Sequence, residues 1–130
     1  MRAIVISSTL FLLPFFYSIQ LRLYFFSVMS GAVYICSVNY WRDPIPGWRH
    51  SMDCVVARSS FLITMGSCVI FVKYPMVYHC AISSILAFIT YTISCKLYER
   101  GYPIWYLYHI GMHICVTYTS LVGLYAIKKY

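Results

Sequence analysis

The sequence predicts an all-α protein, a polytopic transmembrane bundle of about five membrane-spanning helices, and three observations support this fold class. The chain has 130 residues, of which 62% are hydrophobic and only 10% charged, whereas a soluble domain carries about 25% charged residues. Its mean hydropathy is +0.73, so it has more apolar surface than one small core can cover. The apolar residues also fall into runs of about 20, the length that a helix needs to cross a bilayer. We therefore expect one integral, multi-pass membrane domain over residues 1–130.

Short polar segments divide the apolar sequence into these runs. Arg22 marks the first turn, and Pro14 should kink the helix before it, because proline removes a helical hydrogen bond and its ring clashes with the preceding turn. A polar loop at 41–52 follows the second run, and turns at 73–75 and 99–103 separate the last three. The expected spans are 4–20, 22–40, 53–73, 76–97 and 104–126.

The segment from Trp41 to Asp53 is the longest polar stretch, with two acidic residues, two arginines, a histidine, two prolines and two tryptophans. Such a mixture belongs at a membrane–water interface. The prolines and Gly47 should stop a helix, and Ser51 or Asp53 is expected to cap the next one. The N-terminus and the turn at 98–103 fall on the same side of the membrane as this segment, and we call it the loop side.

The positive charge of the chain fits lipid head groups better than a nucleic acid. The net charge is +7, but the ten Lys and Arg residues are spread thinly, mostly at the ends of apolar runs. Long basic side chains at such positions reach toward the head groups. Because they are nearly balanced between the two sides, the positive-inside rule does not fix the orientation. Membrane lipids are the expected partners, and no nucleic acid is expected.

Ionisable residues inside the expected spans are the strongest functional signal, because they are costly in hydrocarbon and usually mark a site. His109 and His113 lie one turn apart on one face of the last span. Asp53 begins the third span and Ser37 lies near the end of the second, both toward the loop side. Topology and helical pitch therefore predict that these four side chains, together with Asn39 at the end of the second span, converge in the loop-side half of the bilayer. His79 lies near the opposite surface and is expected to stay apart.

The predicted cluster has two chemical interpretations. His109 and His113 can bind Zn²⁺ together, with His50 of the loop as third ligand; Asp53 would then orient or deprotonate a metal-bound water, and Ser37 would stabilise an oxyanion. In the other interpretation, the histidines hydrogen-bond to neighbouring hydroxyls and hold the bundle together, and Asp53 is a helix N-cap.

Ser37, Asp53 and the motif His109-Ile-Gly-Met-His113 resemble the CREST superfamily, which includes alkaline ceramidases, adiponectin-receptor-like proteins and lipid-remodelling hydrolases of GPI anchors. The resemblance implies a catalytic role for Ser37 and Asp53, zinc at the histidines, and hydrolysis of an amide or ester bond in a lipid. Two features depart from the family pattern. Position 41, where the family has a third histidine, is a tryptophan, and about five spans are expected here in place of seven.

These observations lead to two hypotheses for function. The first is a reduced CREST-like lipid hydrolase, or a lipid-binding protein derived from one. The second is a non-enzymatic bundle that forms a homo-oligomer or joins a larger membrane assembly, as a structural subunit or a small channel or transport protein. Polar stripes on four of the expected helices support the second hypothesis, because small and polar side chains drive helix association in lipid.

Overall fold

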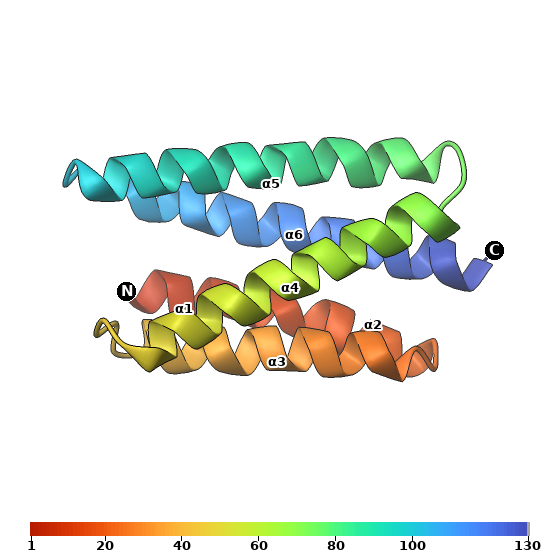
Figure 1. Cartoon of the computed structure of the whole chain (residues 1–130), viewed down its shortest axis with the longest axis horizontal. Coiled ribbons are helices and arrows are strands. Elements are labelled where there is room, and N and C mark those ends of the chain that lie inside the picture. Colours follow the sequence, from red (N-terminus) through yellow and green to blue (C-terminus); the bar gives the residue numbers. More distant parts are fainter. Residues whose placement is uncertain (130) are drawn as a thin grey trace.

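The structure is a computed structural model that describes residues 1–129, and these residues form an all-α bundle (Figure 1). The first segment, from residue 2 to residue 20, runs from the loop side to the opposite side, and the later helices then alternate in direction (Figure 1). Their bounds are α1 (Arg2–Ser8), the 3-10 turn η1 (Thr9–Phe11), α2 (Leu12–Gln20), α3 (Tyr24–Trp41), α4 (Trp48–Phe71), α5 (Met76–Glu99) and α6 (Trp105–Lys129).

The sequence predicts a kink at Pro14, and the first helical segment changes its winding shortly before that residue. Three residues, Thr9–Phe11, form a tighter 3-10 turn between α1 and α2. Pro14 lies three residues after this turn, within α2, and it cannot donate the backbone hydrogen bond that would join it to the preceding turn. Arg22 then adopts a φ of 60° in the turn that reverses the chain.

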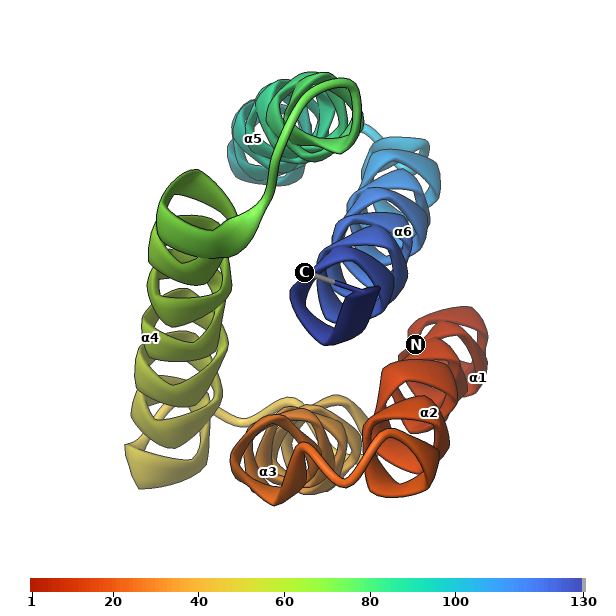
Figure 2. The same ribbon diagram turned by 90° about the vertical axis from the view of Figure 1, so that its right-hand side faces the viewer.

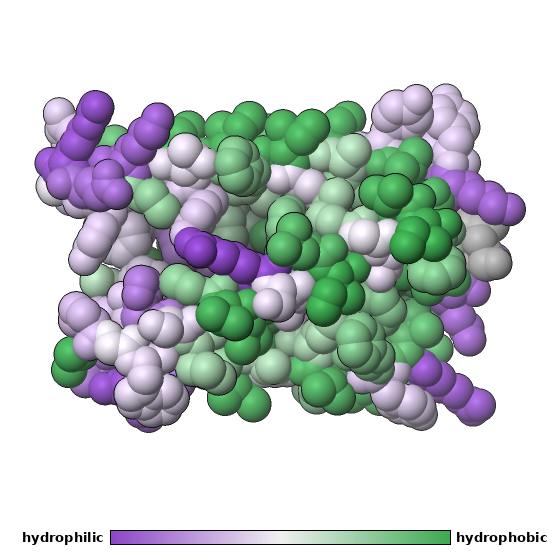
Figure 3. Space-filling view, in the orientation of Figure 1, coloured by the Kyte–Doolittle hydropathy of each residue, from purple (hydrophilic) through white to green (hydrophobic). Residues whose placement is uncertain are grey.

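Four of the helical segments in the described chain are long and apolar enough to cross a membrane: Arg2–Gln20, Trp48–Phe71, Met76–Glu99 and Trp105–Lys129. The 18-residue α3 is not among them. It nevertheless connects the far end of α2 to the loop-side start of α4, so it traverses the same thickness (Figure 1). Figure 3 shows a broad hydrophobic band between two hydrophilic ends. The chain is accordingly a multi-pass membrane protein.

The start of α4 corrects the sequence analysis. The connecting loop covers only 42–47, and the helix begins at Trp48 instead of residue 53. Its N-cap is Gly47, with no side-chain cap, so neither Ser51 nor Asp53 caps it. The polar residues of this stretch are compatible with a helix because a helix end in the head-group region keeps their side chains in a polar environment. Asp53 therefore lies in the second turn of α4.

The last helix, α6, has the most neighbours. It packs extensively against α5 and also contacts α1, α2 and α4, and Figure 2 shows it nearer the middle of the bundle than α5. Near the opposite side, α4, α5 and α6 meet in a small apolar core formed by Cys68, Val72, Cys80 and Ala126. On the loop-side half, the inward-facing residues of α6 are instead polar.

Candidate functional site: a buried polar seam along α6

Two histidines of α6 form the centre of a buried polar seam. His109 is 8% exposed and His113 2% exposed, and their ring centroids are 4.9 Å apart in an edge-to-face arrangement. This inward orientation is the one expected from their spacing of four residues. The seam therefore extends from the loop side into the interior along a single helix face.

His113 is held by a serine of the first helix. The Oγ atom of Ser7 lies 2.8 Å from Nδ1 of His113 and 2.9 Å from the carbonyl oxygen of Ile4. A hydroxyl has one proton to donate, so when it bonds to Ile4 the imidazole Nδ1–H must donate to Ser7. Phe11 packs edge-on against the same ring, with centroids 4.9 Å apart. These contacts join α1 to α6.

Ser37 has a different partner from the one expected. Its Oγ is 2.8 Å from the Oγ of Ser8, which also donates to the carbonyl oxygen of Ile4 over 2.9 Å. Ser37 is 3% exposed, so this hydroxyl pair lies inside the bundle and joins α3 to α1. We find Ser37 in a structural contact, with no histidine or carboxylate among its hydrogen-bond partners in residues 1–129.

Trp41 connects Asp53 to the histidines. Its ring packs edge-on against His109 at 4.9 Å and lies 5.8 Å from Trp105 at the start of α6. The Asp53 carboxylate interacts with the Trp41 side chain, whose indole N–H is its only hydrogen-bond donor. Asp53, Trp41, His109 and His113 thus form a row of neighbouring side chains and not a ring around one point.

His50 does not join this row. It is exposed in the first turn of α4, where its ring lies 4.9 Å from that of Tyr40 and Nε2 lies 3.5 Å from the Sγ of Cys54. The expected grouping of His50 with His109 and His113 is therefore not formed. The early start of α4 explains this, because it turns residue 50 into part of a helix instead of a free loop.

The side chains do not fit a three-histidine zinc centre. Within residues 1–129, no three His, Cys, Asp or Glu side chains come together in a group that could hold a metal ion. The position at which the CREST resemblance expects a third histidine holds Trp41, which has no lone pair to offer a metal and which fills the space beside His109.

Ser7 and Ser8 contribute to the seam, although the sequence predicts neither of them as part of the site. A signal was present for the first of them. Ser7, Phe11, Pro14 and Ser18 recur at helical spacing and are all buried, so the first span also has an inward stripe.

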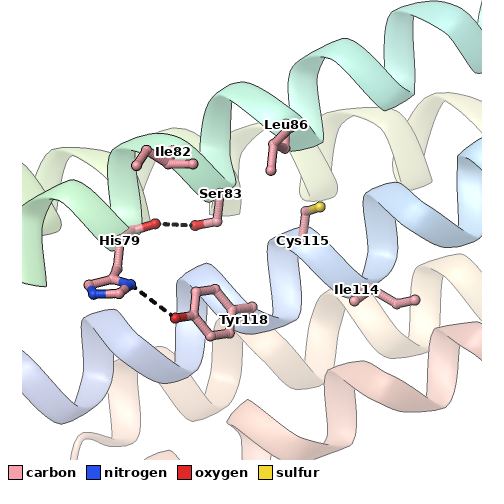
Figure 4. A pocket seen from close by; sticks show the side chains of 7 residues that line it. All are labelled: His79, Ile82, Ser83, Leu86, Ile114, Cys115 and Tyr118. Carbon is pink, nitrogen blue, oxygen red and sulfur yellow. Dashed lines mark hydrogen bonds between the residues drawn. The ribbon is translucent and has the colours of Figure 1, made fainter.

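A separate groove lies on the outer surface between α5 and α6. It has a volume of about 270 Å³, and Figure 4 shows its lining side chains. Nδ1 of His79 is 3.2 Å from the Tyr118 hydroxyl, and beside them Ser83 bonds to Thr119 over 2.6 Å. His79 lies apart from His109 and His113, as expected. The groove is otherwise apolar and open to lipid.

Fold and site together define a helical membrane protein with a buried, internally hydrogen-bonded polar seam. No family model, no curated protein and no solved structure matches the chain.

Proposed function

We propose that the protein is a non-enzymatic subunit of a larger membrane assembly, with α4 as its contact helix. The observation that carries this proposal is the exposure of α4. Of the 18-residue apolar stretch that would cross the membrane, only 6% is buried inside the protein in α4, against 22–33% in the other three candidate spans. Because α4 is the span least covered by its own bundle, it has the most surface to offer another protein.

The outer face of α4 has the pattern of a helix-docking surface. Its exposed residues follow helical spacing, with Ser59 and Gly66 between larger side chains at Val55, Leu62 and Val69. A Cβ atom added at Gly66 would meet nothing within 4 Å. In lipid, small residues of this kind let a second helix approach closely and gain van der Waals contact. We call this surface, formed by these five residues and Arg58, the outer α4 face.

The seam along α6 supports a structural role for the interior. Ser7, Ser8 and Ser37 are each buried and hydrogen-bonded inside the bundle. The two histidines are covered by aromatic rings. A site that hydrolyses a lipid would need an open path from the lipid to the reacting group. These contacts instead cover the seam and join α1, α3 and α6.

Site-specific photo-crosslinking in native membranes tests the proposal. A photoreactive amino acid at Leu62 reports on the outer α4 face, and the same amino acid at Phe88 of α5 is a matched control, because the two side chains are 69% and 68% exposed. We expect an adduct of one discrete mass from position 62 and none from position 88. Gly66→Leu should abolish that adduct by filling the docking surface. Equal, diffuse labelling from both positions would contradict the proposal.

A CREST-like lipid hydrolase or lipid-binding protein is a second candidate, and the row of Asp53, Trp41, His109 and His113 is the observation that favours it. Metal analysis of the purified protein and lipid turnover by the His113→Ala variant test this function. Stoichiometric zinc together with a hydrolytic activity lost in the variant would favour the enzyme. A metal-free protein without such activity would favour the assembly subunit. Conductance in a reconstituted bilayer would indicate the pore form of that subunit.

A further inference from the structure

Arg58 places a positive charge within the hydrophobic part of the outer α4 face. It lies ten residues after Trp48, about 15 Å along a helix that is about 36 Å long. The residue is exposed, and Figure 3 shows hydrophilic atoms inside the hydrophobic band of the face that α4 and α5 present. A charged side chain at such a depth is costly unless a partner compensates it.

The bundle itself gives Arg58 only neutral partners. One guanidinium nitrogen donates to the hydroxyl of Tyr91 on α5 over 3.2 Å, and the other groups that influence Arg58 are the thiols of Cys54 and Cys95. Within residues 1–129, no carboxylate lies within ion-pair distance of Arg58. The guanidinium has five N–H donors in a planar fork that matches a carboxylate, and one hydroxyl uses only one of them.

A second copy of the chain does not supply the missing charge at the right depth. The chain has three acidic residues, Asp43, Asp53 and Glu99, and all lie toward the loop side. Asp53 comes closest, but it is five residues earlier on α4, about 7.5 Å nearer the loop side and about 140° around the helix. In a parallel pair of copies, the acidic residues of one copy would therefore lie nearer the loop side than Arg58 of the other copy.

From this charge and this depth, we propose that the outer α4 face docks a transmembrane helix of a different protein, and that this helix places one Asp or Glu against Arg58. The inference rests on the proposed assembly function and specifies the chemistry of its partner. Ser59 and Gly66 allow the close approach, and Arg58 then selects the helix that has a carboxylate near its middle. Lipid phosphates match Arg58 less well than such a carboxylate does. They lie outside the hydrocarbon, whereas the backbone of Arg58 lies about 15 Å along α4 from its loop-side start.

A model helix of defined sequence tests this inference. The purified protein is reconstituted in phosphatidylcholine vesicles, and binding of a labelled Leu/Ala helix of about 21 residues is followed by energy transfer. One peptide has Glu at its centre, a second has Gln there, and a third has Glu near one end. We expect the central Glu peptide to bind at least about tenfold more tightly than the Gln peptide, equivalent to ~1.4 kcal/mol.

Two protein variants make the test specific. Arg58→Gln should remove the preference for Glu, whereas Arg49→Gln, which also removes one charge from α4 but at its interfacial end, should leave it intact. Equal binding of the Glu and Gln peptides, or an equal effect of the two variants, would overturn the inference. So would a preference that disappears when phosphatidylglycerol replaces part of the lipid, since Arg58 would then bind an anionic head group.

The outcomes separate this inference from the function on which it rests. A discrete adduct from position 62 without any preference for the Glu peptide would support the assembly function but overturn the inference that the partner helix places a carboxylate against Arg58. Self-association of the reconstituted chain that needs both Arg58 and Asp53 would replace the foreign helix by a second copy, and would also overturn the inference.

Discussion

Replacing Gly123 by alanine tests how closely α4, α5 and α6 pack at the opposite side. An added Cβ would lie 2.8 Å from the Sγ of Cys68, whereas non-bonded carbon atoms prefer about 3.5–4.0 Å. Cys68 is 1% exposed and packs with Val72, Cys80 and Ala126. The sulfur therefore has little room to move away, and the helices themselves must shift.

The expected loss of stability follows from two opposing terms. Overpacking a filled core costs about 1–3 kcal/mol, and alanine regains up to about 1 kcal/mol over glycine within a helix. We expect Gly123→Ala to lower the free energy of unfolding by about 1–2 kcal/mol. Gly66→Ala is the matched control on α4, because its new methyl group meets nothing within 4 Å, and it should be neutral or slightly stabilising.

A double-mutant cycle attributes the loss to this contact. Reversible unfolding in mixed micelles, followed by circular dichroism, gives the stability of the wild type, Gly123→Ala, Cys68→Ala and the double variant. Cys68→Ala removes the sulfur, so the double variant should be more stable than the sum of the single effects by about 1 kcal/mol. A Gly123→Ala protein as stable as the wild type, or strictly additive effects, would refute the packing described here.

Two further substitutions test the polar seam by the same unfolding measurement. Ser7→Ala removes the hydroxyl bonded to His113 and should lower the free energy of unfolding by about 1 kcal/mol; unchanged stability would mean that this hydrogen bond does not hold α1 to α6. Trp41→Phe keeps an aromatic ring against His109 but removes the N–H that faces Asp53, and should cost up to about 1 kcal/mol, whereas Trp41→Ala should cost more because the ring is lost as well. Equal losses in the two Trp41 variants would contradict the packing role of the ring.

Most of the fold could be predicted from the sequence because hydropathy is a local property. The observed helices begin and end within a few residues of the expected spans, except at the start of α4. There the polar residues Arg49, His50 and Ser51 are compatible with an interfacial loop or with a helix end in the head-group region. In the structure the loop ends at Gly47 and the helix begins at Trp48. His50 and Asp53 therefore lie within α4, whereas the sequence analysis expected His50 in the loop and Asp53 at the helix start.

The site was predicted less completely. Helical spacing was enough to place His109 and His113 on one inward face, since it depends only on neighbouring turns. The partners of these residues were not predictable in the same way, because Ser7 meets His113 across 106 residues of sequence and Ser8 meets Ser37 across 29. Such pairs depend on how each helix is rotated about its axis.

The sequence by itself determined that this protein is a multi-pass helical bundle with polar inner stripes, because composition and periodicity decide which segments enter a membrane and which face turns inward. Only the tertiary structure decided what those stripes form. The rotation and crossing of the helices, set by side-chain packing between distant segments, placed Trp41 against His109 and left Arg58 of α4 facing outward. The same packing turned residues that resemble a zinc site into a row of contacts between helices.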